Sequence, residues 1–295
     1  MNRILITGAS GILGRALKNE LESNTSYTVF GQAFNRTQGS LIKADLTQPE
    51  EVAKLIDITT PDCIVHCAAE RRPDVSEGDH DATDALNAHA TQSLAEICQN
   101  KGIYFIYLST DYVFDGSKPP YEAEDTPNPL NYYGASKLAG EKAAALCENS
   151  LTLRVPILYG EVESLEESAV TVIAKQLLSK DPKSVDHWAL RYPTSTADVA
   201  SVIRQILEKR PTTEALCGIF QWSGNESFTK YEMAELFGKL WGVSIDHLSP
   251  APETPAGAPR PQNCQLSTRK LSDLGIGANT PFESAIASSL APFKP

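Results

Sequence analysis

The stretch RILITGASGILG, residues 3–14, decides the fold of this chain. Residues 3–7 form a short apolar run with β-branched side chains, which predicts a buried strand. After the glycines, apolar residues recur at helical spacing and charged residues occupy the other face. Strand, glycine turn and helix in this order are the context that a dinucleotide-binding fingerprint requires.

Each glycine of this turn has an expected task. Gly8 would permit the tight turn, Gly11 would let the backbone approach a pyrophosphate, and Gly14 would let the helix pack closely on the strand. The helix N-terminus offers N–H groups and positive potential to phosphates. The alternative is a tight glycine turn without a ligand. The spacing is GxxGxxG and not GxGxxG, which points to one branch of these folds.

The end of the second expected strand, residues 27–33, indicates which dinucleotide binds. An NAD site usually places an acid near this point to bind the ribose 2′-hydroxyl, but here the chain reads Phe34-Asn35-Arg36. Arg36 would pair with a 2′-phosphate through its planar fork, and no carboxylate stands there to repel it. A solvated loop arginine is the alternative. We therefore predict NADP rather than NAD.

Strands and helices continue to alternate along the first half of the chain. The patterns predict strands at 40–46, 62–69 and 103–108, and helices at 49–56 and 85–99. This order implies an α/β fold with a doubly wound parallel sheet of the Rossmann type. Ligands of such sheets bind beyond the carboxyl ends of the strands, where Gly8, Arg36, Asp45, Ala68 and the Ser109-Thr110 pair all fall.

Tyr133 and Lys137 are four residues apart and would share one face of a helix. A free tyrosine keeps its proton to about pH 10, and a neighbouring lysine cation would lower that pKa toward neutrality. Alone, the pair would more often be a chance arrangement on a helix surface. Ser109 or Thr110 would donate a hydrogen bond to a substrate carbonyl beside Tyr133, or would simply satisfy a strand-end backbone group.

Composition limits the classes of function. The 295 residues are 41% hydrophobic, enough for a real core, and the net charge of −11 argues against a nucleic-acid partner. No apolar stretch reaches membrane-spanning length and the chain begins with a strand, so we expect a cytoplasmic protein. Six scattered cysteines indicate core thiols, with neither a disulfide framework nor a metal site, and His66 reads as a packing histidine.

Three motifs together carry a family resemblance: GASGILG, LSTDYVFDG at 108–116 and YGASK at 133–137. They resemble the extended short-chain dehydrogenase/reductases, and within them the dTDP-4-dehydrorhamnose reductase family. Longer runs, such as HCAAERRPDV at 66–75 and LRVPILYGEVESLEESAVTV at 153–172, are more similar still to the regulatory β subunits of methionine adenosyltransferase.

The resemblance implies roles for individual residues. Tyr133 would donate the proton, Lys137 would hold the nicotinamide ribose, and Thr110 would orient the substrate. Ser109 and Arg260 would contact the substrate. The remaining implied NADP contacts are Gly8, Ser10, Gly11, Ile12, Leu13, Gly14, Phe34, Asn35, Arg36, Asp45, Leu46, Cys67, Ala68, Ala69, Arg71, Pro156 and Ile157.

The second half of the chain is less regular. We expect an NADP-binding domain at 1–160 and mainly a smaller α+β substrate-binding lobe at 161–295, with about 192–210 packing back on the first domain. The proline-rich segment 249–261 predicts an irregular loop, either a rim of the cleft or a passive connection. The acidic run at 161–167 predicts a solvated face.

Two classes of function remain, and a third is related to the first. The first is an enzyme that reduces the 4-keto group of a nucleotide-linked deoxysugar with NADPH; an epimerase with the same Tyr/Lys core is the related case. The second is an NADP-binding regulatory partner of methionine adenosyltransferase. The β subunits have an N-terminal extension and a longer C-terminal tail, so we expect their partner contact not to carry over to a chain of residues 1–295.

The substrate-lobe run at 186–194 matches the β subunits better than the reductases. We nevertheless favour the reductase, acting on a small-molecule sugar nucleotide, and a homo-oligomer is compatible with the sequence.

Overall fold

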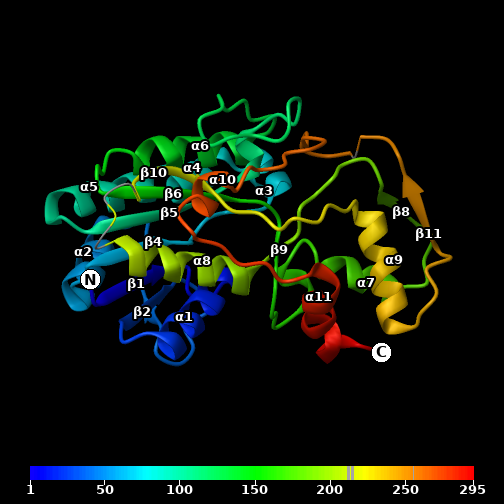
Figure 1. The fold of residues 1–295 in the computed structure, drawn as a ribbon, viewed down its shortest axis with the longest axis horizontal. Helices are drawn as coiled ribbons and strands as arrows, with labels where there is room; N and C mark the ends of the chain where they lie inside the picture. The colour runs from blue at the N-terminus through cyan, green and yellow to red at the C-terminus, as the bar shows by residue number, and fades with distance from the viewer. Residues whose placement is uncertain (211–212, 214–215, 255) are drawn as a thin grey trace.

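A seven-stranded parallel sheet forms the centre of the larger lobe, in the order β10-β6-β5-β4-β1-β2-β3 (Figure 1). The chain runs outward from β1 in one direction and then returns to build the other half, so β1 and β4 flank the reversal. This confirms the doubly wound parallel sheet. The strands are β1 (Arg3–Thr7), β2 (Thr28–Ala33), β3 (Ile42–Lys43), β4 (Cys63–His66), β5 (Tyr104–Thr110), β6 (Ser150–Val155) and β10 (Gly218–Gln221). The computed structural model describes residues 1–210, 213, 216–254 and 256–295.

Helices cover both faces of this sheet because side chains alternate along the buried strands. Ile4 and Ile6 of β1 pack in one core with α1 (Ile12–Asn24) and α8 (Thr196–Lys209). Leu5 faces the opposite core, with α2 (Pro49–Thr59) and α5 (Ala90–Lys101). The helix that carries Tyr133 and Lys137, α6 (Tyr132–Ala144), lies on that second face (Figure 1).

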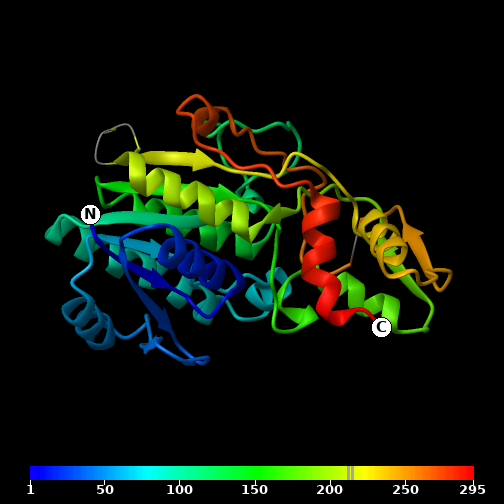
Figure 2. The ribbon, with the colours of Figure 1, turned by 60° about the horizontal axis from the view of Figure 1, so that its bottom comes forward.

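The smaller lobe has its own core, built from three helices and a two-stranded sheet (Figure 2). The helices are α7 (Val172–Leu178), α9 (Lys230–Trp241) and α11 (Phe282–Leu290), and the strands are β8 (Lys183–Asp186) and β11 (Leu248–Ala251). The shorter elements are α3 (Pro73–Gly78), α4 (His80–Asp84), the π-helical turn η1 (Ala85–His89), η2 (Asp111–Val113), β7 (Leu158–Tyr159), η3 (Leu165–Glu167), β9 (Thr194–Ser195), α10 (Arg269–Ser272) and η5 (Ala291–Phe293). No described helix is both long and apolar enough to cross a membrane.

The second half of the chain also contributes to the larger lobe. The α8 helix packs against α1, and β10 pairs in parallel with β6 at the edge of the sheet. Phe220 and Trp222 join the same core as α8. The segment that returns to the sheet therefore extends past residue 210, and the division at residue 160 remains our proposal.

Three expected elements differ from the structure. The third strand shortens to Ile42–Lys43 because Asp45 turns the chain, accepting hydrogen bonds from the Thr47 N–H (2.9 Å) and hydroxyl. The fourth strand ends at His66. The prediction of an irregular 249–261 loop was wrong at its start: β11 pairs with β8, and Pro250 is tolerated because this is an edge strand. Pro255 of that segment lies outside the described residues.

Candidate functional site

A cavity of about 700 Å³ opens at the carboxyl ends of the sheet strands. Its volume is in the range typical of ligand-binding clefts. With the single exception of Arg260, every site residue predicted from the sequence lines this cavity. The topology thus brings together segments that lie far apart in the chain.

The glycine turn forms one wall of the cavity and fits a dinucleotide. Gly8 has a φ of +64°, a conformation that favours glycine, and a Cβ at Gly14 would lie 2.3 Å from the Gly8 carbonyl oxygen. The α1 helix begins after Gly11, and no side chain caps its N-terminus. Its first backbone N–H groups therefore can face a ligand. A pyrophosphate would be held by this turn.

The α6 helix positions the predicted catalytic pair. Asn131 caps the helix by accepting a hydrogen bond from the Gly134 N–H (2.8 Å), and a Cβ at Gly134 would lie 2.2 Å from the Tyr112 carbonyl oxygen. This close approach seats α6 against the segment that follows β5. Lys137 is buried, its Nζ is 4.2 Å from the centre of the Tyr107 ring, and burial lowers its pKa to about 7.

The predicted lowering of the Tyr133 pKa by Lys137 was wrong for this structure. Burial raises the pKa of Tyr133 far above its ordinary value, and a hydrogen bond with Thr110 only partly opposes the increase. Tyr133 itself is half-buried in the wall of the cavity, and Lys137 is desolvated. Burial also raises the pKa of Asp111 to about 7, against the effects of Thr110 and Arg191. A carboxyl group that titrates near neutrality therefore lies beside the phenol.

Ser109 and Thr110 have different environments, although both line the cavity. The Ser109 hydroxyl donates a 2.5 Å hydrogen bond to Glu141, which pairs with Arg154 inside the protein. Thr110 interacts with the Tyr133 phenol. Ser109 thus binds the buried Glu141–Arg154 pair. The Thr110 hydroxyl donates to Asp111 at 3.1 Å and accepts from the Tyr112 N–H at 3.2 Å, so it also satisfies a backbone group at the strand end.

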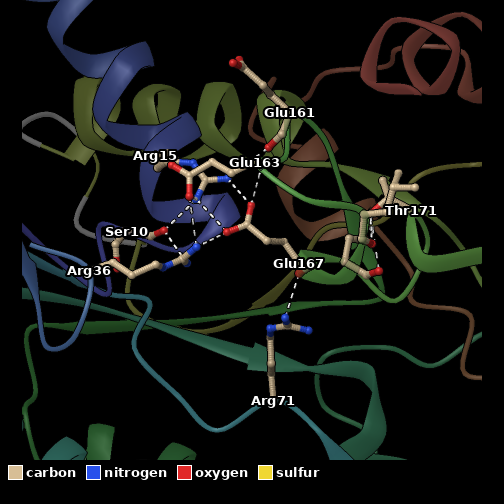
Figure 3. Close-up of polar contacts among 10 residues, drawn as sticks. Ser10, Arg15, Arg36, Arg71, Glu161, Glu163, Glu167 and Thr171 are labelled. Atoms are coloured by element: carbon tan, nitrogen blue, oxygen red, sulfur yellow. Dashed lines mark hydrogen bonds and ion pairs between the residues drawn. The ribbon is translucent and has the colours of Figure 1, made fainter. Parts of the chain in front are cut away.

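The expectation that no carboxylate stands near Arg36 was wrong. Arg36 contacts the carboxylates of Glu163 and Glu167, which approach from a distant segment of the chain (Figure 3). Arg71 donates to the backbone carbonyl of Glu167 at 2.7 Å. The acidic run is therefore not uniformly a solvated face: Glu163 and Glu166 are exposed, but only 10% of the Glu167 side chain is.

Arg260 lies at the edge of the cleft instead of in its lining. Its guanidinium pairs with Asp74 at 2.6 Å and with the Ala258 carbonyl at 2.9 Å, while the neighbouring Pro261 does line the cavity. Arg191 lines the same end and is paired with Asp186 at 2.6 Å. The buried Arg191 cation in this part of the cleft thus already has a carboxylate partner.

Comparison with known proteins identifies the family. The model for the RmlD substrate-binding domain matches residues 1–294. The chain belongs to the RmlD family of extended short-chain dehydrogenase/reductases. It is 49% identical to mouse methionine adenosyltransferase 2 subunit beta, over 99% of this chain and 88% of that one. It is 31% identical to the dTDP-4-dehydrorhamnose reductase of Aggregatibacter actinomycetemcomitans, over 92% of both.

Solved structures of RmlD-family reductases have the same fold. The dTDP-4-dehydrorhamnose reductase from Bacillus anthracis, solved in complex with NADP, superposes with a TM-score of 0.84 at 27% identity, covering 99% of both chains. The predicted resemblance to this family is therefore confirmed. The relatives include both a reductase and a methionine adenosyltransferase subunit. The activity of this RmlD-family chain must therefore be argued from its own residues.

Sequence reasoning missed Asp111, Tyr112 and Arg191, which line the cavity, and two residues outside its lining, Asn87 and Glu167. Asn87 lies in the π-helical turn η1, and its side-chain amide donates to Ser136 and to the Glu70 carbonyl, both at 3.0 Å. An asparagine within a helical pattern gives no local signal of such a contact. Glu167 was missed because its partners come from distant strands and helices. Glu167 and its arginine partners are too far apart in the sequence for a helical i, i+3 or i, i+4 spacing to connect them.

Proposed function

We propose that this chain is an NADP(H)-dependent reductase of a carbonyl compound. The observation that supports this most directly is the meeting of Thr110, Tyr133 and Lys137 in one cavity with the glycine turn. Arg36 and Arg71 line the cavity beside the turn, where a guanidinium would bind the phosphate of a phosphorylated dinucleotide. The NADP complex of the related reductase supports the same coenzyme.

The residues divide the chemistry between them. Bound NADPH would supply a hydride, while Tyr133 donates a proton to the carbonyl oxygen and Thr110 orients that oxygen with its hydroxyl. Lys137 lies one helical turn after Tyr133, where it would bind the coenzyme ribose and stabilise the phenolate once the proton has left. Asp111, with a pKa raised by burial to about 7, would accept and return protons near neutrality.

The proposed substrate is a nucleotide-linked deoxysugar with a 4-keto group. This follows from the reductase relatives, and Arg191 at the far end of the cavity supplies a cation on the substrate side. The test is NADPH oxidation, followed by absorbance, with dTDP-4-dehydrorhamnose generated in situ. Turnover by the natural protein that is lost in Tyr133→Phe would support the proposal. Tight NADPH binding without turnover would refute the choice of substrate.

A second candidate function is a regulatory subunit of a methionine adenosyltransferase. Identity of 49% along 99% of the chain to the mouse β subunit specifically favours it. The test is co-purification with a methionine adenosyltransferase, using Tyr133→Phe as a matched variant. A complex that forms equally well with both proteins, together with absent turnover, would favour the regulatory role. Turnover without a complex would exclude it.

A further inference from the structure

Three arginines, of which Arg36 and Arg71 line the cleft, converge on the segment between β7 and α7. Arg15 of α1 binds the Glu167 carboxylate with Nη2 at 2.6 Å and Nη1 at 3.3 Å. Arg36, after β2, contacts Oε1 of the same carboxylate, the oxygen that Arg15 Nη1 also contacts, and Arg71 binds the Glu167 backbone carbonyl (Figure 3). One glutamate thus joins three separate parts of the cleft wall.

This carboxylate is built into its position. The Glu163 N–H donates to Glu167 Oε2 at 2.9 Å, and Glu167 closes the short helical turn η3. Burial alone would raise the pKa of Glu167, but hydrogen bonds from Arg15 and Arg36 outweigh it and bring the pKa to about 2. The side chain therefore remains an anion throughout the physiological range.

The same contacts occupy the donors that a phosphate would need. Arg36 directs Nη1 to the Glu167 carboxylate and Nη2 to the Ser10 carbonyl at 2.7 Å. Arg15 also donates to the Ser10 carbonyl, at 2.7 Å. A guanidinium binds a phosphate best through two parallel N–H groups, and in Arg36 both terminal nitrogens already have partners.

We propose that Glu167 is an internal competitor of the coenzyme 2′-phosphate, and that its carboxylate is a latch which this phosphate displaces from Arg36. The inference rests on the proposed NADP function and extends it to coenzyme selectivity. A dinucleotide with a 2′-phosphate takes Arg36 from Glu167, whereas one without it leaves the contact intact. Glu167 consequently reduces the affinity for NADP more than the affinity for NAD.

The experiment is isothermal titration of the full chain with NADP⁺ and with NAD⁺, comparing Glu167→Gln and Glu166→Gln with the natural protein. The control removes the same charge from the adjacent position, where Glu166 is half exposed and pairs with Lys175. We expect Glu167→Gln to tighten NADP⁺ binding about tenfold, which corresponds to about 1.4 kcal/mol, with NAD⁺ binding changed less than about twofold. The control should leave both affinities unchanged.

Several outcomes would overturn the latch. Unchanged or weaker NADP⁺ binding by Glu167→Gln would show that Glu167 instead holds the arginines ready for the phosphate. Equal tightening for NAD⁺ would remove the 2′-phosphate from the explanation. When Arg36→Gln is also present, Glu167→Gln should no longer tighten NADP⁺ binding. Tightening that persists would show that Arg36 is not the group for which Glu167 and the phosphate compete. If the natural protein binds neither dinucleotide, the proposed function itself fails. That result differs from dinucleotide binding in which Glu167→Gln leaves the ratio of NADP⁺ to NAD⁺ affinity unchanged, which refutes only the latch.

A measurement on the natural protein guards against a variant that folds poorly. Because the Glu163 amide donates to the Glu167 carboxylate, displacement of that carboxylate should accelerate exchange of the amide hydrogen. Saturating NADP⁺ should increase exchange at Glu163, and saturating NAD⁺ should not. Equal or greater protection with NADP⁺ would contradict a displaced latch.

Discussion

The buried pair of Glu141 and Arg154 offers a sharp test of how α6 is anchored. Glu141 follows Lys137 by one helical turn, and its carboxylate accepts two hydrogen bonds from Arg154 of β6, at 2.8 and 2.7 Å. The exposed fractions of the two side chains are only 4% and 1%. Ser109 donates to the same carboxylate, and Arg154 also binds the Ala123 carbonyl at 3.2 Å.

Replacing Glu141 by glutamine should lower the free energy of unfolding by about 3–5 kcal/mol. The glutamine retains one oxygen, but its amide group turns donors toward the guanidinium and leaves the buried Arg154 cation without a counter-charge. Two charge-assisted hydrogen bonds, each worth about 1.5–3 kcal/mol, are lost or weakened, which gives a similar figure of about 3–6 kcal/mol. Urea-induced unfolding followed by circular dichroism measures this difference.

Two comparisons make the reasoning refutable. Glu208→Gln removes the same charge from an exposed helical pair with Arg204 and should cost less than about 1 kcal/mol. The double variant Glu141→Leu with Arg154→Met removes both charges and should cost less than Glu141→Gln alone. A double variant as damaging as the sum of its single substitutions, or a Glu141→Gln cost below about 1 kcal/mol, would refute the account.

Other variants test the site itself. Gly14→Ala would place a Cβ 2.3 Å from the Gly8 carbonyl, so we expect a loss of about 1–3 kcal/mol in urea unfolding and weaker NADP⁺ binding by titration. Thr110→Val should reduce kcat for the proposed reduction about 10- to 100-fold, because the hydroxyl beside Tyr133 is lost, with NADP⁺ affinity unchanged. Asp111 has a folded pKa of about 7, above its unfolded value of 3.8, so its contribution to stability is lost as pH rises through 7. Asp111→Asn should therefore match the natural protein near pH 4 and exceed it at pH 8 by up to about 4 kcal/mol, checked by urea unfolding at both pH values; a constant difference would contradict this sign.

The sequence by itself determined the features that depend on local pattern. The strand of residues 3–7, the glycine turn and the helix after it form a continuous unit, and their interactions are mostly between near neighbours. The alternation of strands and helices was enough to predict the parallel sheet and the edge at which ligands bind. The spacing of Tyr133 and Lys137 likewise follows from helical geometry, which needs no knowledge of the rest of the chain.

Only the tertiary structure decided which charges meet and how burial changes them. Glu167 reaches Arg15 and Arg36 across the cleft, and Glu141 meets Arg154 between a helix and a strand; no local period encodes either contact. Ser109 and Thr110 are adjacent in sequence, but Ser109 donates to Glu141 and Thr110 interacts with Tyr133, two turns earlier on the same helix, so only the packing of α6 on β5 decides which partner each hydroxyl has. The pKa values of Tyr133 and Lys137 depend on desolvation, which comes from packing by many distant segments and not from the spacing of the two residues.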